Sequence, residues 1–431
     1  MAKNQQDILN KLKIDELNPM QIAAGHAIHS SSNVVLLSPT GSGKTLAFLL
    51  PLIHSIDTKC DEIQALILVP TRELALQIEQ VAREMGTGLK INAVYGGQSG
   101  SRDRMALKHR PAILIGTPGR VADRLRRDDF SLKSLSTIVL DEFDKSLEIG
   151  FEKEMKEIIG TLPAIKKRVL TSATQKLAVP KFVGLENLTT VDFTGTANSE
   201  LIVQKVIGNN KLNALIDLLH HIGDAQGIIF CNFKDTINEV SNQLTAHQIS
   251  HGVFQGGMEQ VDREEALIKL RNGTHNIIIA TDLAARGIDV NDLKFIIHYE
   301  LPPRETEYTH RNGRTARMNA DGTAYLLFGD RQRIPDYIPS MEALNLTKQD
   351  FKGYTEWRTL LVSTGRQDKV SKGDIAGTFF KIGQLNKDEL GIIEIKQTCA
   401  FVAVHHAKAK KVAASLNNAK IKKKKVRVRL I

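Results

Sequence analysis

The 431 residues are 42% hydrophobic and 25% charged, a composition that is typical of globular proteins and argues against fibrous and membrane-spanning classes. Lys and Arg exceed Asp and Glu by 10, and the whole surplus lies after residue 370, where 14 basic residues stand against 4 acidic ones. This concentration predicts an appended polyanion-binding unit rather than a uniformly basic enzyme. The cysteines, Cys60, Cys231 and Cys399, have no CxxC spacing, so we expect reduced thiols and no zinc site.

The amino-terminal segment alternates charged and apolar residues at helical spacing, without the continuous apolar stretch of a signal peptide. No run in the chain approaches the length that spans a membrane. We therefore expect a cytoplasmic protein with no membrane partner. The length exceeds what one hydrophobic core usually organises, so we also expect two or three domains.

Short apolar runs rich in β-branched residues alternate with segments of helical periodicity. Runs that are apolar on both faces and separated by helices are typical of buried parallel strands in a doubly wound α/β sheet. The predicted strands begin at residues 33, 65, 91, 112, 137, 168, 227, 276, 295 and 323. They predict two parallel-sheet domains, over residues 1–200 and 201–345.

The pattern weakens over residues 346–371, which we interpret as a linker. Trp357, in this segment, is either a packing anchor or a binding residue. The last residues, 372–431, read as strand, helix, strand, strand, helix, strand, which predicts a small α+β domain. Its final stretch alternates apolar and basic side chains as a half-buried strand does: Val426, Arg427, Val428, Arg429 and Leu430.

A glycine-rich loop, SPTGSGKT at residues 38–45, follows the first predicted strand and precedes a helix-prone segment. Glycines let the backbone wrap a phosphate, and a helix amino terminus directs N–H groups toward it. In such a loop Lys44 reaches the outer phosphates and the Thr45 hydroxyl binds Mg²⁺. The other predicted nucleotide ligands of the loop are Thr40, Gly41, Ser42 and Gly43. An ordinary glycine-rich turn is the alternative, and the strand–loop–helix context argues against it.

Three carboxylates, Asp141, Glu142 and Asp144, follow the apolar run 138–140. Like charges this close repel unless a cation, a donor or solvent compensates them. Asp141, at the strand end, can hold Mg²⁺ through water, and Glu142 can orient or deprotonate an attacking water. A solvated helix start is the alternative, because acids near a helix amino terminus are also favourable. Beside Lys44, the cluster favours a site for ATP and Mg²⁺.

Ten segments, in order and over nearly the whole chain, resemble the motifs of the DEAD-box ATP-dependent RNA helicases of superfamily 2. They are NPMQ (18–21), SPTGSGKT (38–45), PTRELA (70–75), GG (96–97), TPGR (117–120), DEFD (141–144), SAT (172–174), QVDR (260–263), ATDLAARGID (280–289) and HRNGRTAR (310–317). Each motif is weak alone, but ten in one order are very hard to produce by accident. The resemblance implies two RecA-like domains and an RNA-stimulated ATP hydrolase.

The resemblance also implies roles at the ATP site. Gln21 is expected to read the adenine edge, because a side-chain amide offers both a donor and an acceptor. Asp289 is expected to contact the ribose. Arg314 and Arg317 are expected to reach the γ-phosphate as arginine fingers, because the guanidinium fork matches phosphate oxygens and stays charged. With Lys44 and Glu142 they complete the expected catalytic set.

Two further groups follow from the resemblance. Residues expected to couple the nucleotide site to domain movement are Asp144, Ser172, Thr174 and His310. Residues expected to contact the RNA backbone are Arg72, Gly97, Thr117, Arg120, Arg263, Thr281 and Arg286. Contacts of this kind carry no base information, so we expect the core to bind RNA with little sequence preference and more weakly at high salt.

The sequence departs from the family at three places. Phe143 replaces the alanine of the DEAD motif, and we expect catalysis to survive with altered packing. Asn312 and Ala316 stand where Ile and Gly are usual. No Phe, Tyr or Trp precedes Phe48, although the family packs adenine with aromatic residues ahead of the glutamine. This absence predicts weakened adenine affinity or selectivity, which a comparison of ATP with GTP tests.

Residues 374–431 resemble the RRM-like domain of DbpA-type bacterial DEAD-box helicases, which implies targeting to ribosomal RNA during assembly of the large subunit. Phe401 is the sole aromatic residue on the predicted third strand, so a base-stacking pair is absent from it. Recognition is therefore expected to rest on Lys422, Lys423, Lys424, Lys425, Arg427 and Arg429. A solubilising basic tail without a defined ligand is the alternative.

The favoured hypothesis is a monomeric, RNA-stimulated ATPase that separates short RNA duplexes when ATP and RNA close its two domains. A ribosomal assembly particle is its expected partner. The alternative is a ribosomal-RNA-binding clamp or annealing factor without productive unwinding. The presence of every phosphate-site side chain argues against this alternative.

Overall fold

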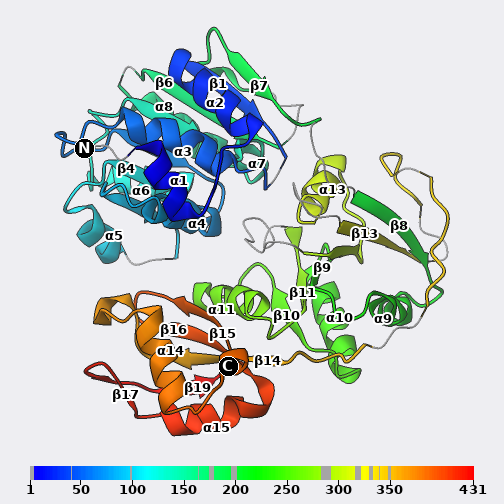
Figure 1. The fold of residues 1–431 in the computed structure, drawn as a ribbon. Helices are drawn as coiled ribbons and strands as arrows, with labels where there is room; N and C mark the ends of the chain where they lie inside the picture. Colours follow the sequence, from blue (N-terminus) through cyan, green and yellow to red (C-terminus); the bar gives the residue numbers. More distant parts are fainter. Residues whose placement is uncertain are drawn as a thin grey trace. The chain divides into compact units, whose positions relative to one another are not determined.

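The computed structural model describes residues 4–39, 41–97, 100–163, 165–173, 179–195, 201–282, 293–315, 322–329, 333–338, 340–347 and 351–431. These residues form two compact units, one on either side of residue 200 (Figure 1). Within them, no helix is both long and apolar enough to cross a membrane. All three cysteines are free thiols, as predicted.

The first unit is built on a seven-stranded parallel sheet with the strand order β3-β4-β2-β5-β6-β1-β7. Its strands are β1 (Asn33–Leu37), β2 (Ala65–Leu68), β3 (Ile91–Val94), β4 (Ile113–Gly116), β5 (Thr137–Leu140), β6 (Lys167–Ser172) and β7 (Thr189–Asp192). The six predicted runs form β1 to β6. The edge strand β7 is not among the predictions because its sequence, TTVD, contains no apolar run.

Helices cover both faces of this sheet. One apolar cluster packs one face against α1 (Gln5–Leu12), α2 (Pro19–Ser30), α3 (Lys44–Ser55) and α4 (Arg72–Glu84). A second cluster packs the other face against α5 (Gly100–Leu107), α6 (Pro118–Arg126), α7 (Phe143–Glu148), α8 (Glu152–Gly160) and η1 (Lys181–Val183). Neighbouring strand residues alternate between the clusters: Val34 joins the first and Val35 the second. The doubly wound α/β fold is therefore confirmed.

The second unit contains a six-stranded parallel sheet with the order β10-β11-β9-β12-β13-β8. Its strands are β8 (Leu201–Ile207), β9 (Gly227–Phe230), β10 (His251–Phe254), β11 (Ile277–Ala280), β12 (Phe295–His298) and β13 (Gly322–Phe328). Its helices are α9 (Lys211–Ile222), α10 (Lys234–Ala246), α11 (Gln260–Arg271) and α13 (Glu305–Asn312). The four predicted runs form β9, β11, β12 and β13. The unpredicted strands, β8 and β10, lie at the two edges and are only partly buried.

The same unit ends in an antiparallel sheet with the order β15-β16-β14-β19. Its strands are β14 (Trp357–Val362), β15 (Leu390–Ile395), β16 (Ala400–His405) and β19 (Val428–Leu430), beside the hairpin of β17 (Lys420–Ile421) and β18 (Lys424–Lys425). The helical elements are η2 (Arg366–Asp368), α14 (Lys372–Lys381), η3 (Lys387–Glu389) and α15 (His406–Leu416). The apolar side chains of α14 and α15 join those of one sheet face in a single core. The small α+β domain is therefore confirmed.

The linker predicted over residues 346–371 is wrong in its second half. Strand β14 lies there and pairs with both β16 and β19, inside the sheet. The strand opens with Trp357, Arg358 and Thr359, so its continuous apolar run is only three residues long and gives a weak signal. Residues 372–431 begin with α14, so the strand predicted first in that segment is wrong and β14, before it, takes that place. The later order strand, strand, helix, strand is present, with the β17–β18 hairpin inserted before the last strand.

Candidate nucleotide and RNA sites

The first sheet places the predicted site residues at the carboxyl ends of its strands, where ligands of open α/β sheets bind. The phosphate loop follows β1, Asp141 follows β5, and Ser172 ends β6, and these three strands are neighbours. The predicted RNA contacts follow the other half of the sheet: Arg72 after β2, Gly97 after β3 and Thr117 after β4. One half of this carboxyl edge thus carries the residues predicted to bind ATP, and the other half carries those predicted to bind RNA.

The phosphate loop has the backbone that its glycines predict. Gly41 and Gly43 have φ of 85° and 86°, in the left-handed region that favours glycine. A Cβ at Gly43 would lie 2.5 Å from Nε2 of Gln21. Lys44, the first residue of α3, donates from Nζ to the carbonyl oxygens of Ser38 (2.6 Å) and Pro39 (2.9 Å). Its ammonium group therefore lies within the loop.

Gln21 contacts this loop directly. Its Nε2 donates to the carbonyl oxygen of Gly43 (3.3 Å), and its Oε1 accepts from the backbone N–H of Asn18 (3.0 Å). Asn18 caps α2 and donates from Nδ2 to the carbonyl oxygen of Ser42 (3.0 Å). Each amide group of Gln21 keeps one further hydrogen-bonding position, which is what an adenine edge requires. Asn18 is a site residue that the motifs do not predict, although Asn before Pro at a helix start predicts a cap.

Asp141 is 3% exposed and lies among hydrogen-bond donors. The Thr171 hydroxyl and the backbone N–H of Glu142 (3.1 Å) both donate to its Oδ1. Burial, and then repulsion from Glu142, raises the pKa of Asp141 to about 6. Burial lowers the pKa of Lys44 to about 8, although Asp141 and Glu142 act in the opposite direction. Both groups are therefore charges held out of water. Thr171, immediately before the SAT motif, is a contact that the motif alone does not predict.

Glu142 has left-handed backbone dihedrals, φ 48° and ψ 49°, at the turn from β5 into α7. Its Oε2 lies 3.2 Å from Nζ of Lys145, which is 1% exposed. Sequence reasoning does not single out Lys145, although a lysine three residues after a glutamate on a helix is a known pairing. The pair holds Glu142 beside Asp141 with part of its charge compensated.

The residues of the loop fit a triphosphate with Mg²⁺. Ser38 Oγ and Ser42 Oγ are buried, and neither has a hydrogen-bond partner among the residues that the structure describes. Two such hydroxyls, left-handed glycines and a lysine form a donor set suited to a polyanion. The described residues contain no group of three His, Cys, Asp or Glu side chains that could hold a metal. Mg²⁺ would therefore rely on Asp141, Thr45, phosphate oxygens and water.

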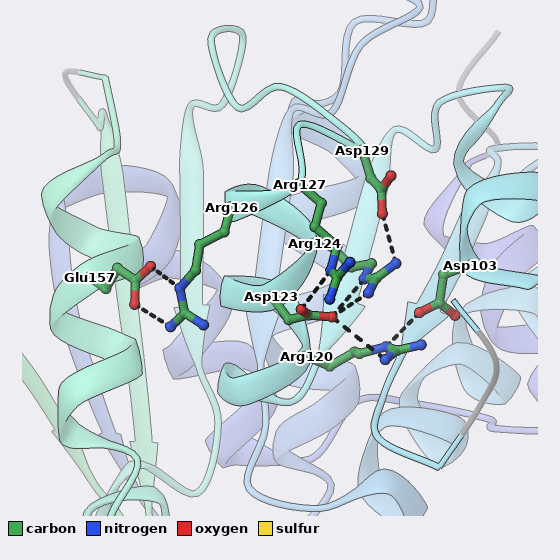
Figure 2. Close-up of polar contacts among 8 residues, drawn as sticks. All are labelled: Asp103, Arg120, Asp123, Arg124, Arg126, Arg127, Asp129 and Glu157. Carbon is green, nitrogen blue, oxygen red and sulfur yellow. Dashed lines mark hydrogen bonds and ion pairs between the residues drawn. The ribbon is translucent and has the colours of Figure 1, made fainter. Parts of the chain in front are cut away.

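Arg120 belongs to the half of the first sheet that is predicted to bind RNA, and it already pairs with acidic side chains (Figure 2). Its Nε donates to Asp103 Oδ2 at 2.6 Å, and its Nη1 lies 3.7 Å from Asp123 Oδ2. Asp123 also pairs with Arg124, which bonds Asp129 at 2.8 Å. A phosphate that approaches Arg120 must therefore compete with Asp103, which is 2% exposed.

Arg72 and Gly97 are brought together. Gly97 has φ 88°, and a Cβ there would lie 2.4 Å from Nη1 of Arg72. The guanidinium thus lies against the glycine backbone, and the positive φ of Gly97 favours glycine at this position. Thr117 begins α6, is 7% exposed and makes no side-chain cap bond.

The second sheet repeats the division of its edge. Arg263, on α11 after β10, lies over the Phe254 ring at 4.9 Å, and Thr281 follows β11. His310 and Arg314 come after β12, nearer the other end of the sheet. Both are largely buried, with exposed fractions of 9% and 5%. The predicted residues that lie outside the described part of the chain are Thr40, Thr174, Arg286, Asp289 and Arg317.

Arg311, which the sequence does not single out, has hydrogen-bond partners for all three guanidinium nitrogens. It bonds Asp282 through Nε (2.7 Å) and Nη2 (2.6 Å), the Glu300 carbonyl oxygen through Nη1 (2.6 Å), and Asn232 Oδ1 through Nη2 (2.6 Å). It is 1% exposed and lies over the Phe230 ring at 5.0 Å. Arg311 is therefore a buried structural residue.

Asn312, one of the departures from the family, has a partner. Its Oδ1 lies 3.0 Å from Nε2 of His298, which is fully buried at the end of β12. Burial, and then Arg311, lowers the pKa of His298 to about 3, so the imidazole is neutral at physiological pH. An isoleucine at position 312 would leave Nε2 of His298 without this hydrogen-bond partner. The two polar residues, Asn312 and His298, are therefore a matched pair.

Two basic residues of the last domain pair with acidic side chains, and most of the basic residues of its final stretch are exposed. Lys422 Nζ lies 2.9 Å from Asp374 Oδ2, and Lys424 Nζ lies 2.7 Å from Asp368 Oδ2. The exposed members are Lys422, Lys423, Lys425, Arg427 and Arg429. Val426 and Val428 are buried between them, as the alternation predicts, whereas Leu430 is 38% exposed because β19 ends there, at the sheet edge.

Three family models match the chain in succession. The DEAD/DEAH box helicase model matches residues 18–182, the helicase conserved C-terminal domain matches residues 210–319, and the DbpA RNA binding domain matches residues 359–430. The last match includes most of β14, in agreement with the structure.

Among curated relatives, ATP-dependent RNA helicase DbpA of Escherichia coli (strain K12) is 33% identical over 439 residues, covering 98% of this chain and 96% of the relative. DbpA of Bacillus subtilis (strain 168) is 32% identical over 435 residues, covering 92% and 91%. Among solved structures, S. cerevisiae Dbp5 bound to RNA and ADP BeF3 is similar with a TM-score of 0.66 at 26% identity, covering 75% of this chain and 88% of that one. DEAD-box helicase Mss116 bound to ssRNA and UDP-BeF gives 0.66 at 25% identity, covering 76% and 74%.

Proposed function

Because the chain belongs to the DEAD-box ATP-dependent RNA helicases of the DbpA type, and is thus an ATP-hydrolysing enzyme with an RNA-binding domain, we propose that it separates short duplexes of ribosomal RNA. The observation that carries the proposal is the divided carboxyl edge. In the first sheet, the phosphate loop and the acidic residues expected at ATP follow one group of strands, and the residues expected at RNA follow another. Among the described residues of the second sheet, Arg314, expected at ATP, follows β12, whereas Arg263 and Thr281, expected at RNA, follow β10 and β11. Residues of one rigid sheet can thus contact both ATP and RNA.

At the nucleotide, Lys44 binds the outer phosphates, and the orphan hydroxyls of Ser38 and Ser42 gain partners from the same oxygens. Asp141 and Thr45 would hold Mg²⁺, which would neutralise phosphate charge when bound. Glu142, held by Lys145, orients the attacking water and accepts its proton.

The second sheet supplies the remaining charge. Arg314 and Arg317 stabilise the γ-phosphate during transfer when ATP and RNA binding bring the two units together. The closed state bends one RNA strand so that its partner cannot stay paired, and hydrolysis mainly reopens and recycles the enzyme. Arg72, Thr117 and Arg263 contact the RNA backbone, so strand separation does not depend on sequence.

The choice of ribosomal RNA is assigned to the last domain. Its basic surplus is exposed on one hairpin and one strand edge, at Lys423, Lys425, Arg427 and Arg429. Lysines and arginines on a surface bind a folded RNA through its phosphates. The relatives that share this domain carry the name DbpA.

The proposal is tested with a labelled short RNA duplex carried on a fragment of large-subunit ribosomal RNA. We expect strand release that requires ATP, together with phosphate release that the fragment stimulates. An unrelated RNA of equal length is the control for targeting, and neutralising the four exposed basic residues is expected to abolish the difference between the RNAs. Binding to RNA without ATP-dependent strand release would instead indicate a clamp.

A further inference from the structure

The last domain docks on the second parallel sheet through the face of its own sheet that is opposite α14 and α15. Arg271, at the end of α11, pairs with Glu394 on β15 at 2.9 Å. The hydroxyls of Thr274 and Thr359 are 2.7 Å apart, and both residues are buried. Thr355 Oγ1 donates to the Thr274 carbonyl oxygen at 2.9 Å. The two parts are therefore joined by specific polar contacts.

A cavity of about 550 Å³ opens beside these contacts, a volume within the range of small-ligand sites. It is shared by the turn after α11, the segment before β14, and the adjoining ends of β15 and β16. No residue assigned above to ATP or RNA binding lines it. The cavity is lined by residues of both the second parallel-sheet domain and the last domain, so an RNA strand bound there would contact both.

Two aromatic residues line the cavity. Tyr354 is 51% exposed, and Trp357 is the only tryptophan in the chain. The indole lies against two glycine backbones: a Cβ would lie 3.4 Å from Cδ1 if placed at Gly273 and 3.0 Å from Cζ3 if placed at Gly391. Ile392, 52% exposed, adds an apolar surface. Exposed aromatic rings of this kind stack on unpaired bases of single-stranded RNA.

One buried acceptor in the lining has no partner. Asn272 is 4% exposed, and its Nδ2 donates to Thr359 Oγ1 at 3.3 Å. Its Oδ1 accepts no hydrogen bond from any residue that the structure describes. A buried acceptor without a partner is rare and unfavourable, and a ligand with an N–H donor would satisfy it. The exocyclic amino groups of adenine, cytosine and guanine are such donors.

The charges of the lining balance. Asp224 and Glu356 oppose Arg271 and Lys352, and Arg271 is already paired with Glu394. A balanced lining attracts a phosphate weakly, which distinguishes this cavity from the basic hairpin of the same domain. A neutral, flat group with an amino substituent fits it better than an anion does.

We propose that this cavity binds one unpaired base of the RNA, stacked on Tyr354 beside Trp357, with the exocyclic amino group donating to Asn272 Oδ1. The proposal rests on the proposed function, because it takes RNA as the substrate. It adds a base-selective contact that the backbone-binding core does not provide. It predicts a preference for adenine over uracil at one position, because the larger purine ring stacks more strongly. Hydrogen bonding alone does not give this preference, since the N3–H of uracil can also donate to Asn272.

The test uses the intact protein and the emission of Trp357, which reports on this cavity alone. Single-stranded decamers of adenylate are expected to quench the emission, and uridylate decamers to do so only at higher concentration. Stacking on one aromatic residue is worth roughly a tenfold change in affinity, so Tyr354→Ala should raise the quenching midpoint about tenfold. Tyr354→Phe should restore it. Phe380→Ala, a residue of α14 that is 37% exposed, is the matched control and should change nothing.

The outcomes separate this inference from the proposed function. An unchanged midpoint in Tyr354→Ala, or equal quenching by a blunt duplex, would overturn the base site. RNA-stimulated phosphate release would persist in that case, and the proposed function would stand. If the decamers neither quench Trp357 nor bind the wild-type protein in a separation assay, and RNA leaves phosphate release unchanged, both proposals are overturned.

Discussion

Buried charged groups differ in their hydrogen-bond partners between the predicted ATP end of the first sheet and the corresponding end of the second sheet. In the first, Lys44 and Asp141 are out of water, the pKa values of both are shifted toward neutrality, and two nearby hydroxyls have no partner in the described residues. In the second, Arg311 is just as buried but uses its guanidinium on three partners. We interpret buried polar groups without hydrogen-bond partners as groups that bind a ligand, and a buried residue with all its hydrogen-bond partners as a structural one.

The largest expected effect is on catalysis at the first end. Lys44→Ala should reduce ATP turnover by about 10³-fold, because charge stabilisation at the transferred phosphate is lost. It should leave the free energy of unfolding within about 1 kcal/mol of wild type, because a desolvated cation adds little stability. Steady-state phosphate release and urea denaturation measure the two quantities. Lys59→Ala, an exposed lysine of the same unit, is the control, and a Lys44→Ala protein that unfolds would contradict the comparison.

Arg311→Ala should show the reverse pattern. Removing it leaves Asp282 and the acceptors of Glu300 and Asn232 without their donor, so the second unit should lose about 3–5 kcal/mol of stability. Trp357 emission during urea denaturation follows this unit, since no other tryptophan is present. Arg304→Ala, an exposed arginine before α13, should be neutral. A stable Arg311→Ala protein that has lost only turnover would move Arg311 into the catalytic set.

Phe143 tests whether the first end tolerates its unusual motif. The side chain is fully buried in the cluster of α6, α7 and α8, so Phe143→Ala should destabilise the first unit by about 3 kcal/mol through the cavity it leaves. The carboxylates on either side remain, so turnover per folded molecule should stay within a few-fold of wild type. Calorimetry and phosphate release at low temperature separate these quantities. Faster turnover in Phe143→Ala would instead mean that Phe143 displaces its neighbours from their working positions.

The smallest effect is the loss of stability over the first pH unit below 6.5. In the unfolded chain His298 gains a proton below its ordinary pKa of 6.5, but in the folded second unit burial, and then Arg311, delays this to about pH 3. The unfolded state binds more protons in this interval, so stability falls as the pH drops below 6.5, by at most about 1.4 kcal/mol per unit. His298→Gln should flatten the dependence measured by Trp357 emission. His275, whose pKa burial lowers to about 4, retains part of it.

At the first end the same titration has the opposite sign. The pKa of Asp141 is raised by burial and by Glu142, so the folded state binds the proton first and mild acid favours folding there. Calorimetry measures the stability of each unit as a function of pH. If acid changes the stability of both units in the same direction, the contrast between the two ends has no thermodynamic consequence.

The sequence predicts much of this fold because its buried strands are continuous apolar runs. The strands that escape prediction are β7, β8, β10, β14, β17 and β18. They are edge strands, very short strands or strands with only a short apolar run, so their pairing depends on neighbours that periodicity does not reveal. At the site, ordered motifs identify Lys44 and Asp141, since their spacing is fixed by one loop and one strand end. Thr171, Lys145 and Arg311 are not identified, because their contacts arise only when separate strands and helices meet.

The docking of the last domain sets a length scale for the enzyme. Contacts of Arg271, Thr274 and Trp357 hold the last domain against the turn that follows α11 in the second unit. Under the proposed function, an RNA bound by the lysines of that domain would therefore lie at a fixed distance from the second sheet. A flexible tether would sample many spans and act on any duplex nearby. Under the same proposal, the docked domain would favour duplexes that lie a set number of nucleotides from the RNA element that it binds.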